Sequence, residues 1–502
     1  MSLSVIHTRA QLGIQSPSVA VEVHLSGGLP SLAIVGLPET AVKESRERVR
    51  SALITAGFDF PQRRITINLA PADLPKEGGR YDLAIALGIL QASGQLKNDK
   101  LHQFEVLGEL ALSGEIRSVR GALPASIACG QARRALILPA CNADEATLMG
   151  DTPVLGVSHL LQLHQYLSGK LKLEFACRVE AEEPLIHTCP DMSDVKGQLQ
   201  ARRALEVAAA GQHNLLFTGP PGSGKSMLAS RLPGLLPELT PEQCLEVAAI
   251  HSVAGMSVLD ACQGVRPFRA PHHTASAAAL VGGGSHPRPG EISLAHQGVL
   301  FLDELPEFPR RVLDVLREPM ETGEILISRA ARQTLYPACF QLVAAMNPCA
   351  CGYYGDGTDR CICTPDQIRR YQGRVSGPLL DRIDIQLWVA ALPADALLRP
   401  GEQAESSADI RARVLRAREI QLQRQGSSNR LLSGRFLEEH CHLDSDSRRL
   451  LTQAMDNLGI SARACHRLLR VARTLADLEG HDRVEQSHLL EALAFRGNGL
   501  RR

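Results

Sequence analysis

The spacing of hydrophobic and polar positions divides the chain into two kinds of segment. Up to about residue 390, short apolar runs of strand length alternate with stretches that have the spacing of amphipathic helices. The clearest in the first part are strands at 32–36, 64–70 and 135–140, helices at 39–57 and 81–93, and a hairpin closed at Ser113 and Gly114. Farther along, only helical spacing remains, in stretches at 407–425, 432–441, 446–459, 461–480 and 484–495. The pattern predicts an α/β protein that ends in a helical bundle.

The length of the chain indicates several domains. A chain of 502 residues is too long for one core, and at about 150 residues per domain we expect between two and four. Residues 171–195 show no sustained periodicity and carry prolines and several acids, which is typical of a linker. We therefore expect a mixed α/β domain over 1–170, a second α/β domain over 196–392, and a helical domain over 393–502.

Composition and charge limit the classes of protein that fit. Lys and Arg together number 54, as do Asp and Glu, so the net charge is zero and any basic surface must be local. The N-terminal residues lack the pattern of a signal peptide, and no apolar run reaches the length of a membrane span. We expect a cytoplasmic protein, in which the thirteen cysteines stay reduced rather than form disulfides.

The strongest motif is a phosphate-binding loop. It matches the pattern G-x-x-x-x-G-K-[ST], follows an apolar strand and precedes a helix. Its glycines allow backbone N–H groups to converge on phosphate oxygens, while its lysine reaches the β- and γ-phosphates and its serine binds Mg²⁺. These nucleotide-binding residues are Gly219, Pro220, Pro221, Gly222, Ser223, Gly224, Lys225 and Ser226. The sequence therefore predicts a site for ATP and Mg²⁺.

Two further strands end in polar residues that fit this site. The apolar run at 298–302 leads into Asp303 and Glu304, and the run at 340–346 leads into Asn347. Parallel strands end at a common edge of their sheet, so these side chains should meet the loop. We expect Asp303 to hold Mg²⁺, Glu304 to polarise the attacking water, and Asn347 to orient that water beside the γ-phosphate.

Four cysteines lie in the short segment CACGYYGDGTDRCIC, as two C-x-C pairs. Cys349, Cys351, Cys361 and Cys363 can supply four thiolates to one tetrahedral Zn²⁺. Free thiols and redox chemistry are the alternatives. Four thiolates leave no open coordination position, so we expect structural rather than catalytic zinc.

The chain resembles AAA+ ATPases of the magnesium-chelatase-like branch, and most closely the ComM/YifB group. The resemblance rests on 195–226, on FRAPHHTASAAALVGGG, on PRPGEISLAHQGVLFLDELPEF and on SGPLLDRIDI. It implies a P-loop core with a parallel sheet, a C-terminal helical lid and assembly into a hexameric ring. It also implies that Arg382 is the arginine finger that completes a neighbour's ATP site, and that Arg463 is the sensor arginine of the lid, with Arg467 as a rival.

The same resemblance places insertions where a threaded polymer would pass. One spans 266–291 and contains His272 and His273, for which we favour contact with the pore or the nucleotide over a plain structural role. The other is a hairpin expected over 324–340, with Arg329 and Arg332 near its turn. Basic side chains at such a tip would bind phosphates of DNA.

The N-terminal domain resembles the Lon-type protease domain, on PADLPKEGGRYDLAIALG and LGELALSGEIRSVRGALPASIA. Arg80 stands where that family has its nucleophilic serine, and no lysine occurs between Gly121 and Ala135, where its partner lysine would fall. A Ser–Lys dyad needs both groups. We therefore expect a proteolytically inert domain.

Three functions follow as hypotheses. The first is an ATP-driven hexameric DNA motor, a helicase or branch-migration enzyme that promotes integration of incoming DNA in natural transformation. The second is a chelatase-type motor that remodels a protein partner for metal insertion. The third is an ATP-dependent protease, against which the missing dyad counts. We favour the first, with single-stranded or branched DNA as partner.

Overall fold

The computed structural model describes residues 2–177, 189–283, 287–329, 332–392, 404–458 and 460–497. The chain forms two compact units, of which the first comprises Met1–Leu185 with Pro241–Gln263 and the second comprises Ile186–Thr240 with Gly264–Arg502. The middle of the expected linker, 178–188, and the expected start of the helical domain, 393–403, lie outside the described residues. Among the described residues, no helix combines the length and apolar character that crossing a membrane requires.

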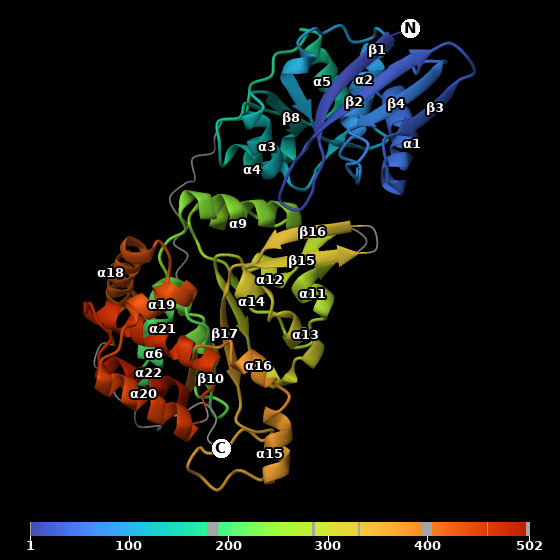
Figure 1. The fold of residues 1–502 in the computed structure, drawn as a ribbon. Helices are drawn as coiled ribbons and strands as arrows, with labels where there is room; N and C mark the ends of the chain where they lie inside the picture. Colours follow the sequence, from blue (N-terminus) through green and yellow to red (C-terminus); the bar gives the residue numbers. More distant parts are fainter. Residues whose placement is uncertain are drawn as a thin grey trace. The chain divides into compact units, whose positions relative to one another are not determined.

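The first unit is built on a seven-stranded mixed sheet (Figure 1). The strand order is β3-β4-β2-β1-β5-β8-β9, with β2 antiparallel to β1 and β4 and parallel pairing elsewhere. The strands are β1 (Ser2–Arg9), β2 (Ser18–Ser26), β3 (Ser31–Val35), β4 (Arg64–Ala70), β5 (Phe104–Val106), β8 (Ala135–Pro139) and β9 (Val154–Val157). In β2 and β4 fully buried residues alternate with partly exposed ones, whereas Leu136 to Pro139 of β8 are all buried. The sheet is therefore covered on both faces only around β8.

The helices of the first unit fill two hydrophobic cores. The larger core joins the buried faces of β1, β2 and β4 to α1 (Thr40–Thr55), α2 (Asp82–Ala92) and α5 (Leu160–Leu167). The smaller core lies beside β8 and holds residues of α3 (Ala122–Gln131) and α4 (Ala143–Thr147). The expected hairpin is present as β6 (Glu109–Leu110) and β7 (Ile116–Arg117).

The segment Pro241–Gln263 departs from the sequence-based division. We expected it within the second α/β domain, because it lies between the phosphate-binding loop and Asp303. It instead belongs to the first unit, where α9 (Pro241–Ala254) packs against α3 and the backbone N–H of Gly121 donates to the carbonyl of Ser252. The second α/β domain is therefore discontinuous in sequence.

The second unit contains a five-stranded parallel sheet in the order β11-β14-β17-β10-β18. Its strands are β11 (Phe268–Arg269), β14 (Val299–Leu302), β17 (Gln341–Met346), β10 (Leu215–Thr218) and β18 (Ile385–Trp388). Every residue of β10, β14 and β17 is buried, as expected for a parallel sheet between layers of helices. Because all five strands run the same way, their carboxyl ends share one edge of the sheet.

The C-terminal helices pack on this sheet through one continuous core. They are α18 (Ser407–Gln425), α19 (Gly434–His440), α20 (Ser445–Leu458), α21 (Ala462–Glu479) and α22 (Gln486–Gly497), close to the five stretches expected. Apolar residues of α18, α21 and α22 join those of β10, β18 and α6 (Leu199–Gly211) in the core. Figure 1 shows these helices grouped around α6.

The second expected hairpin is also present. β15 (Glu324–Arg329) pairs antiparallel with β16 (Arg332–Pro337), and Arg329 and Arg332 form the last pair before the turn. One face is buried through Ile325, Ile327 and Tyr336, while Leu326 and Leu335 are about half exposed on the other. The insertion at 266–291 contains β11, α11 (Ala277–Val281), β12 (Gly282–Gly283) and β13 (Arg288–Pro289).

Candidate functional site

The phosphate-binding loop lies at the carboxyl edge of the parallel sheet. It connects β10 to α7 (Lys225–Ala229), and Gly222 and Gly224 adopt positive φ angles that glycine tolerates best. A Cβ atom on Gly219 would lie 2.1 Å from the carbonyl oxygen of Val389, so the close approach of the backbone requires glycine there. The buried Ser223 hydroxyl has no hydrogen-bond partner among the described residues. The loop thus offers unused polar groups to a phosphate-bearing ligand.

The ends of two neighbouring strands meet this loop as predicted. The Lys225 ammonium donates to Asn347 Oδ1 at 3.2 Å and to the carbonyls of Gly219 and Pro220 at 2.9 Å. Burial lowers the pKa of Lys225, and the Asp303 carboxylate opposes that shift. A phosphate would replace the carbonyls as a stronger, charged partner for Lys225.

A pair of oxygen atoms marks the expected magnesium position. The Ser226 hydroxyl donates to Asp303 Oδ2 at 2.6 Å, which joins the end of the loop to the end of β14. A hydroxyl and a carboxylate are the hard oxygen ligands that Mg²⁺ prefers. The residues fit the ion, which when bound neutralises phosphate charge.

Glu304 adopts an unusual backbone conformation and has a partner that the sequence did not predict. Its φ of 51° lies in the left-handed region, which a non-glycine residue occupies only at a cost. Its carboxylate Oε2 lies 3.0 Å from His273 Nδ1. His273 in turn packs against His272, with ring centroids 4.1 Å apart and the rings tilted by 34°. For His273 we weighed contact with the pore or the nucleotide against a plain structural role. The contact with Glu304 supports a position near the nucleotide site.

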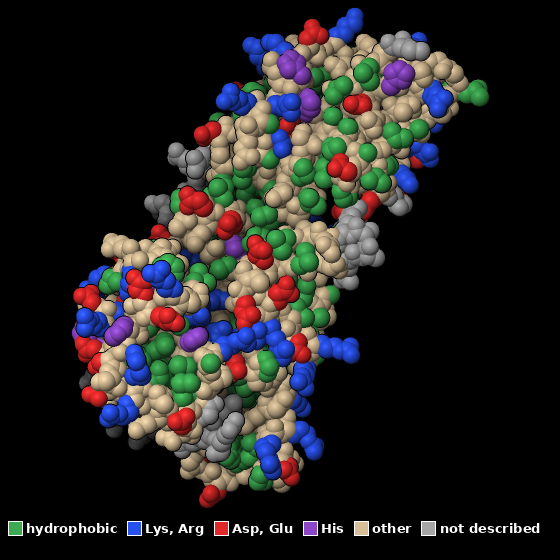
Figure 2. All heavy atoms as spheres, in the orientation of Figure 1, with side chains coloured by type: hydrophobic (Ala, Val, Ile, Leu, Met, Phe, Trp, Pro, Cys, Tyr) green, Lys and Arg blue, Asp and Glu red, His purple; other side chains and the backbone are tan. Residues whose placement is uncertain are grey.

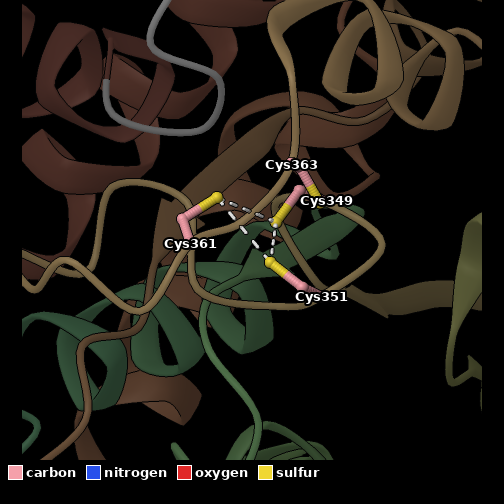
Figure 3. A group of neighbouring side chains, drawn as sticks. All are labelled: Cys349, Cys351, Cys361 and Cys363. Atoms are coloured by element: carbon pink, nitrogen blue, oxygen red, sulfur yellow. Dashed lines mark hydrogen bonds between the residues drawn. The ribbon is translucent and has the colours of Figure 1, made fainter.

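The four predicted cysteines converge in one cluster (Figure 3). The Sγ atoms of Cys349 and Cys351 are 3.3 Å apart, those of Cys349 and Cys361 3.9 Å, and those of Cys351 and Cys361 3.7 Å. All four sulfur atoms, including that of Cys363, lie within 4.8 Å of one another. A tetrahedral zinc–thiolate site with bonds of about 2.3 Å places its sulfurs about 3.8 Å apart. The cluster therefore fits Zn²⁺.

Without a bound cation, the pKa values of two thiols in this cluster are shifted in opposite directions. Burial, together with its neighbours Cys351 and Cys349, raises the pKa of Cys361 to about 11. Burial also acts on Cys351, but hydrogen bonds from the Tyr353 backbone and Cys349 outweigh it and lower the pKa to about 6. A divalent cation would stabilise all four as thiolates.

The cysteine segment touches the phosphate-binding loop directly. Gly352 has a φ of 90°, and a Cβ atom there would lie 2.7 Å from the Pro221 ring. On the other side, α15 (Pro365–Gln372) begins just after Cys363 with a capping box at Thr364, and Gln372 donates to the carbonyl of Pro348. The segment is thus held between the loop and α15.

The structure adds Gln198, which sequence reasoning did not single out. Its φ is 51°, and its amide donates to the carbonyls of Ser223, in the loop, and Ala390, after β18. A lone glutamine carries no motif of its own. The one feature of the sequence that could have drawn attention to Gln198 was its position within 195–226, one of the segments on which the family resemblance rests.

Arg382 lies at the opposite edge of the sheet from the loop. It follows α16 (Gly377–Leu380) and precedes β18 by two residues, so it stands at the amino end of a strand. Its guanidinium forms an ion pair with Glu321 at 2.9 Å and donates to the carbonyl of Pro378. The structure therefore separates Arg382 from the nucleotide site of its own chain.

Arg463 and its rival Arg467 differ in their surroundings. Arg467 is buried and donates to Asp384 at 2.8 Å and to the carbonyl of Arg382 at 2.9 Å. Arg463, one turn earlier on α21, is exposed, and its side chain has no hydrogen bond or ion pair with the described residues. Arg467 thus has a structural partner, and Arg463 is available to a ligand.

Two other predicted features can be placed only in part. Arg329 and Arg332 flank the hairpin turn, but their side chains lie outside the described residues. Arg80, which we expected at the position of the Lon-type nucleophile, is buried and donates to the carbonyl of Arg120 at 2.6 Å.

A second group of possible metal ligands does not suit a metal. Glu479, His481 and His488 lie close together. The His488 Nδ1 accepts from the backbone N–H of Glu485, so its Nε2 carries the proton and donates to Glu479 at 3.0 Å. A metal at Nε2 would have to displace that proton.

Comparison with known proteins agrees with this geometry. Residues 191–397 match the family described as "Magnesium chelatase, subunit ChlI", residues 21–142 match "Subunit ChlI of Mg-chelatase", and residues 404–496 match "Magnesium chelatase, subunit ChlI C-terminal". These three matches together cover both units and the C-terminal helices.

Similar proteins extend over the full length of the chain. It is 51% identical to "Competence protein ComM" of Haemophilus influenzae, over 99% of this chain and 98% of that protein. It is 50% identical to "Uncharacterized protein YifB" of Escherichia coli, over 99% and 97%. The "Magnesium-chelatase 38 kDa subunit" of Cereibacter sphaeroides is 25% identical over 59% of this chain and 87% of that subunit. The chain therefore belongs to the ComM/YifB family of magnesium-chelatase-like proteins with a AAA+ fold.

Proposed function

We propose that the protein is an ATP-hydrolysing DNA motor that assembles into a hexameric ring. The observation that carries the ATPase part is the convergence of Lys225, the Ser226–Asp303 pair and Asn347 at one sheet edge. In this proposal Lys225 binds phosphate oxygens, Ser226 and Asp303 hold Mg²⁺, Asn347 orients water, and Glu304 accepts its proton. Arg382 acts as the arginine finger on the nucleotide of a neighbouring subunit, and Arg463 acts as the sensor arginine of the lid.

The DNA part of the proposal rests on similarity and on the hairpin. The protein of Haemophilus influenzae that is 51% identical bears the name competence protein, which points to work on incoming DNA. The hairpin β15–β16 carries Arg329 and Arg332 beside its turn and exposes Leu326 and Leu335 on one face. Cations with neighbouring apolar groups suit the phosphates and bases of single-stranded DNA. The proposed activity is of the helicase or branch-migration type.

The proposed zinc site serves this motor as a structural element. Cys349, Cys351, Cys361 and Cys363 hold the ion, which when bound cross-links the segment that follows Asn347. The contact between Gly352 and Pro221 supports a role in fixing the phosphate-binding loop.

ATP hydrolysis by the purified protein tests the proposal, with and without single-stranded or forked DNA. We expect DNA to raise the rate. Branch migration on a three-strand junction, measured beside simple duplex unwinding, should require ATP and be lost in Lys225→Ala and Glu304→Gln. Arg449→Ala, an exposed change on α20, is the control and should keep both activities. No stimulation and no DNA binding at low salt would refute the DNA motor.

A chelatase-type motor remains the second candidate. It is favoured by the family matches, whereas the magnesium-chelatase subunit itself is only 25% identical over 59% of the chain. This second function would be supported if the rate of ATP hydrolysis were unchanged by DNA but increased by a chelatase partner protein.

A further inference from the structure

Four arginine side chains gather at the amino edge of the parallel sheet in the second unit. Figure 2 shows Lys and Arg side chains gathered over the region where Figure 1 places α14 and α16. We define the arginine cluster as Arg382, Arg430, Arg467 and Arg470. Arg470 follows Arg467 by three residues on α21, so the two lie on the same face of that helix. Arg382 pairs with Glu321 of α14 (Pro319–Thr322), and Arg430 donates to the carbonyl of the adjacent Met320 at 2.9 Å. Arg467 donates to the carbonyl of Arg382 at 2.9 Å, so these groups are neighbours.

The charges of the cluster are not balanced. Arg382 has Glu321 as its carboxylate partner and Arg467 has Asp384. The Arg430 side chain binds only the carbonyls of Met320 and Phe340, and the Arg470 side chain has no hydrogen bond or ion pair with the described residues. Two guanidinium groups therefore lack a carboxylate within contact distance in the described part of the chain.

Such cations are costly in this environment. Burial lowers the pKa of both Arg430 and Arg470. Asp384 attracts both, but it is already bound by Arg467 and by the backbone N–H of Asn214. A partly buried cation without a paired anion is destabilising unless a ligand supplies the anion. Since both side chains keep some exposure, an external anion can reach them.

The nucleotide of the same chain cannot be that anion. Phe340, whose carbonyl binds Arg430, directly precedes β17, and Arg382 directly precedes the turn into β18. The phosphate-binding loop follows the opposite ends of these strands. Strands of four to six residues, at about 3.3 Å per residue, separate the two edges by roughly 13–20 Å. The anion must come from another molecule.

We propose that Arg430 and Arg470 bind phosphate oxygens of a nucleoside triphosphate held by a second copy of this chain, beside Arg382. The three side chains converge from the end of α16, from η5 (Asn429–Leu431) and from α21, rather than forming a row along one element. Convergent guanidinium groups match a compact polyphosphate, to which each can donate in a bidentate manner. The inference rests on the proposed ATPase and adds two residues to its trans-acting side.

Arg470→Ala is the sharpest test, because Arg470 has no described partner to lose. We expect the kcat of ATP hydrolysis to fall about 10- to 100-fold, since a cation that stabilises transferring phosphoryl charge is removed. Binding of a fluorescent ATP analogue to the unassembled subunit, measured at protein concentrations too low for assembly, should stay within about twofold, because Arg470 does not contact the nucleotide of its own chain. Arg470→Lys should restore only part of the rate, and Arg449→Ala should leave it unchanged.

Mixed assemblies separate action on a neighbour from action within one chain. Arg470→Ala subunits keep an intact loop, and Lys225→Ala subunits keep an intact Arg470. Mixing the two nearly inactive variants should restore activity, because some interfaces then combine both intact halves. No restoration, with each variant still assembling normally, would overturn the inference.

Other results of the Arg470 substitutions would distinguish a failure of this inference from a failure of the proposed ATPase. If the wild-type protein hydrolyses ATP and Arg470→Ala hydrolyses it equally fast, this inference is wrong while the ATPase stands. Unchanged hydrolysis with weaker DNA binding would assign the cluster to DNA instead. A lowered Tm and lost assembly in both Arg470→Ala and Arg470→Lys would assign it a structural role. If the wild-type protein hydrolyses no ATP, the proposed function itself has failed.

Discussion

The two edges of the parallel sheet in the second unit differ in how their charged groups are satisfied. At the carboxyl edge Lys225, Ser226, Asp303 and Asn347 bond to one another across three elements. At the amino edge Arg430 and Arg470 lack a carboxylate partner among the described residues. The carboxyl edge has the groups to bind a whole nucleotide with its Mg²⁺, whereas the amino edge offers only cations that could contact phosphate oxygens. If the proposed assembly is right, each copy of the chain carries two unequal parts of a nucleotide site.

The largest expected effect comes from Arg382→Ala. Removing an arginine finger should lower kcat by about 10³-fold, because such residues contribute 10³ to 10⁵ in related phosphoryl transfers. The affinity of an unassembled subunit for ATP should stay unchanged, because Arg382 lies at the far edge of the sheet from the phosphate-binding loop of its own chain. Steady-state rates and equilibrium binding check this. A loss of affinity comparable to the loss of rate would break the distinction between the edges.

Acid should destabilise the amino edge through His213. Burial, with Arg470, Arg418 and Arg430 nearby, lowers the pKa of His213 to about 4 from 6.5, against the pull of Asp384. The folded state therefore disfavours protonation, so its stability is full above pH 6.5 and falls as the pH drops toward 4. At most, about 3 kcal/mol is lost across that range. Thermal unfolding of wild type and His213→Gln should show a shallower pH slope in the variant; equal slopes would contradict the assignment.

Loss of one cysteine should weaken the carboxyl edge. Cys361→Ala should remove about one zinc per subunit and destabilise the fold by about 2 kcal/mol or more, because loss of a bound metal is among the changes with large effects on stability. Nucleotide affinity should fall with it, because Gly352 packs on Pro221. Metal analysis, Tm and ATP binding measure the three effects. Cys141→Ala, an exposed cysteine in the first unit, is the matched control. Full zinc content in Cys361→Ala would refute the site.

The smallest expected change comes from His273→Ala. The variant frees the Glu304 carboxylate from a contact at 3.0 Å, so the basal kcat should rise about threefold with KM unchanged. His102→Ala, an exposed change in the first unit, serves as the control. A fall in kcat would mean that His273 orients Glu304 productively rather than restraining it.

The carboxyl edge could be predicted from sequence because its information is local. A strand, a glycine-rich loop and a helix occupy consecutive residues, and Asp303 and Asn347 each end an apolar run. At the amino edge, Arg382 and the candidate sensor residues Arg463 and Arg467 came from the family resemblance, whereas Arg430 belongs to no motif and is placed by the carbonyl of Phe340, far away in sequence. The contacts of Gln198 and His273 escaped prediction for the same reason.

In the fold, too, features that depend on neighbouring residues in the sequence were predicted better than features that depend on distant ones. The C-terminal helices and β4 were predicted from periodicity nearly to the residue. β1 and β2 were overlooked although SVAVEVHLS alternates strictly, and that alternation was the available signal. The membership of Pro241–Gln263 in the first unit was missed because periodicity gives an element's type but not the partner on which it packs.

That discontinuous segment sets an order of events during synthesis. The ribosome delivers the chain from its N-terminus, so Gly219–Ser226 leaves the exit tunnel before α9 does. The first unit cannot bury α9 against α3 until then. The first unit can complete its fold only after residues Ile186–Thr240, which belong to the second unit, have been synthesised. A nascent chain halted before residue 241 should therefore remain protease-sensitive at α3, and one halted well beyond residue 263 should be protected.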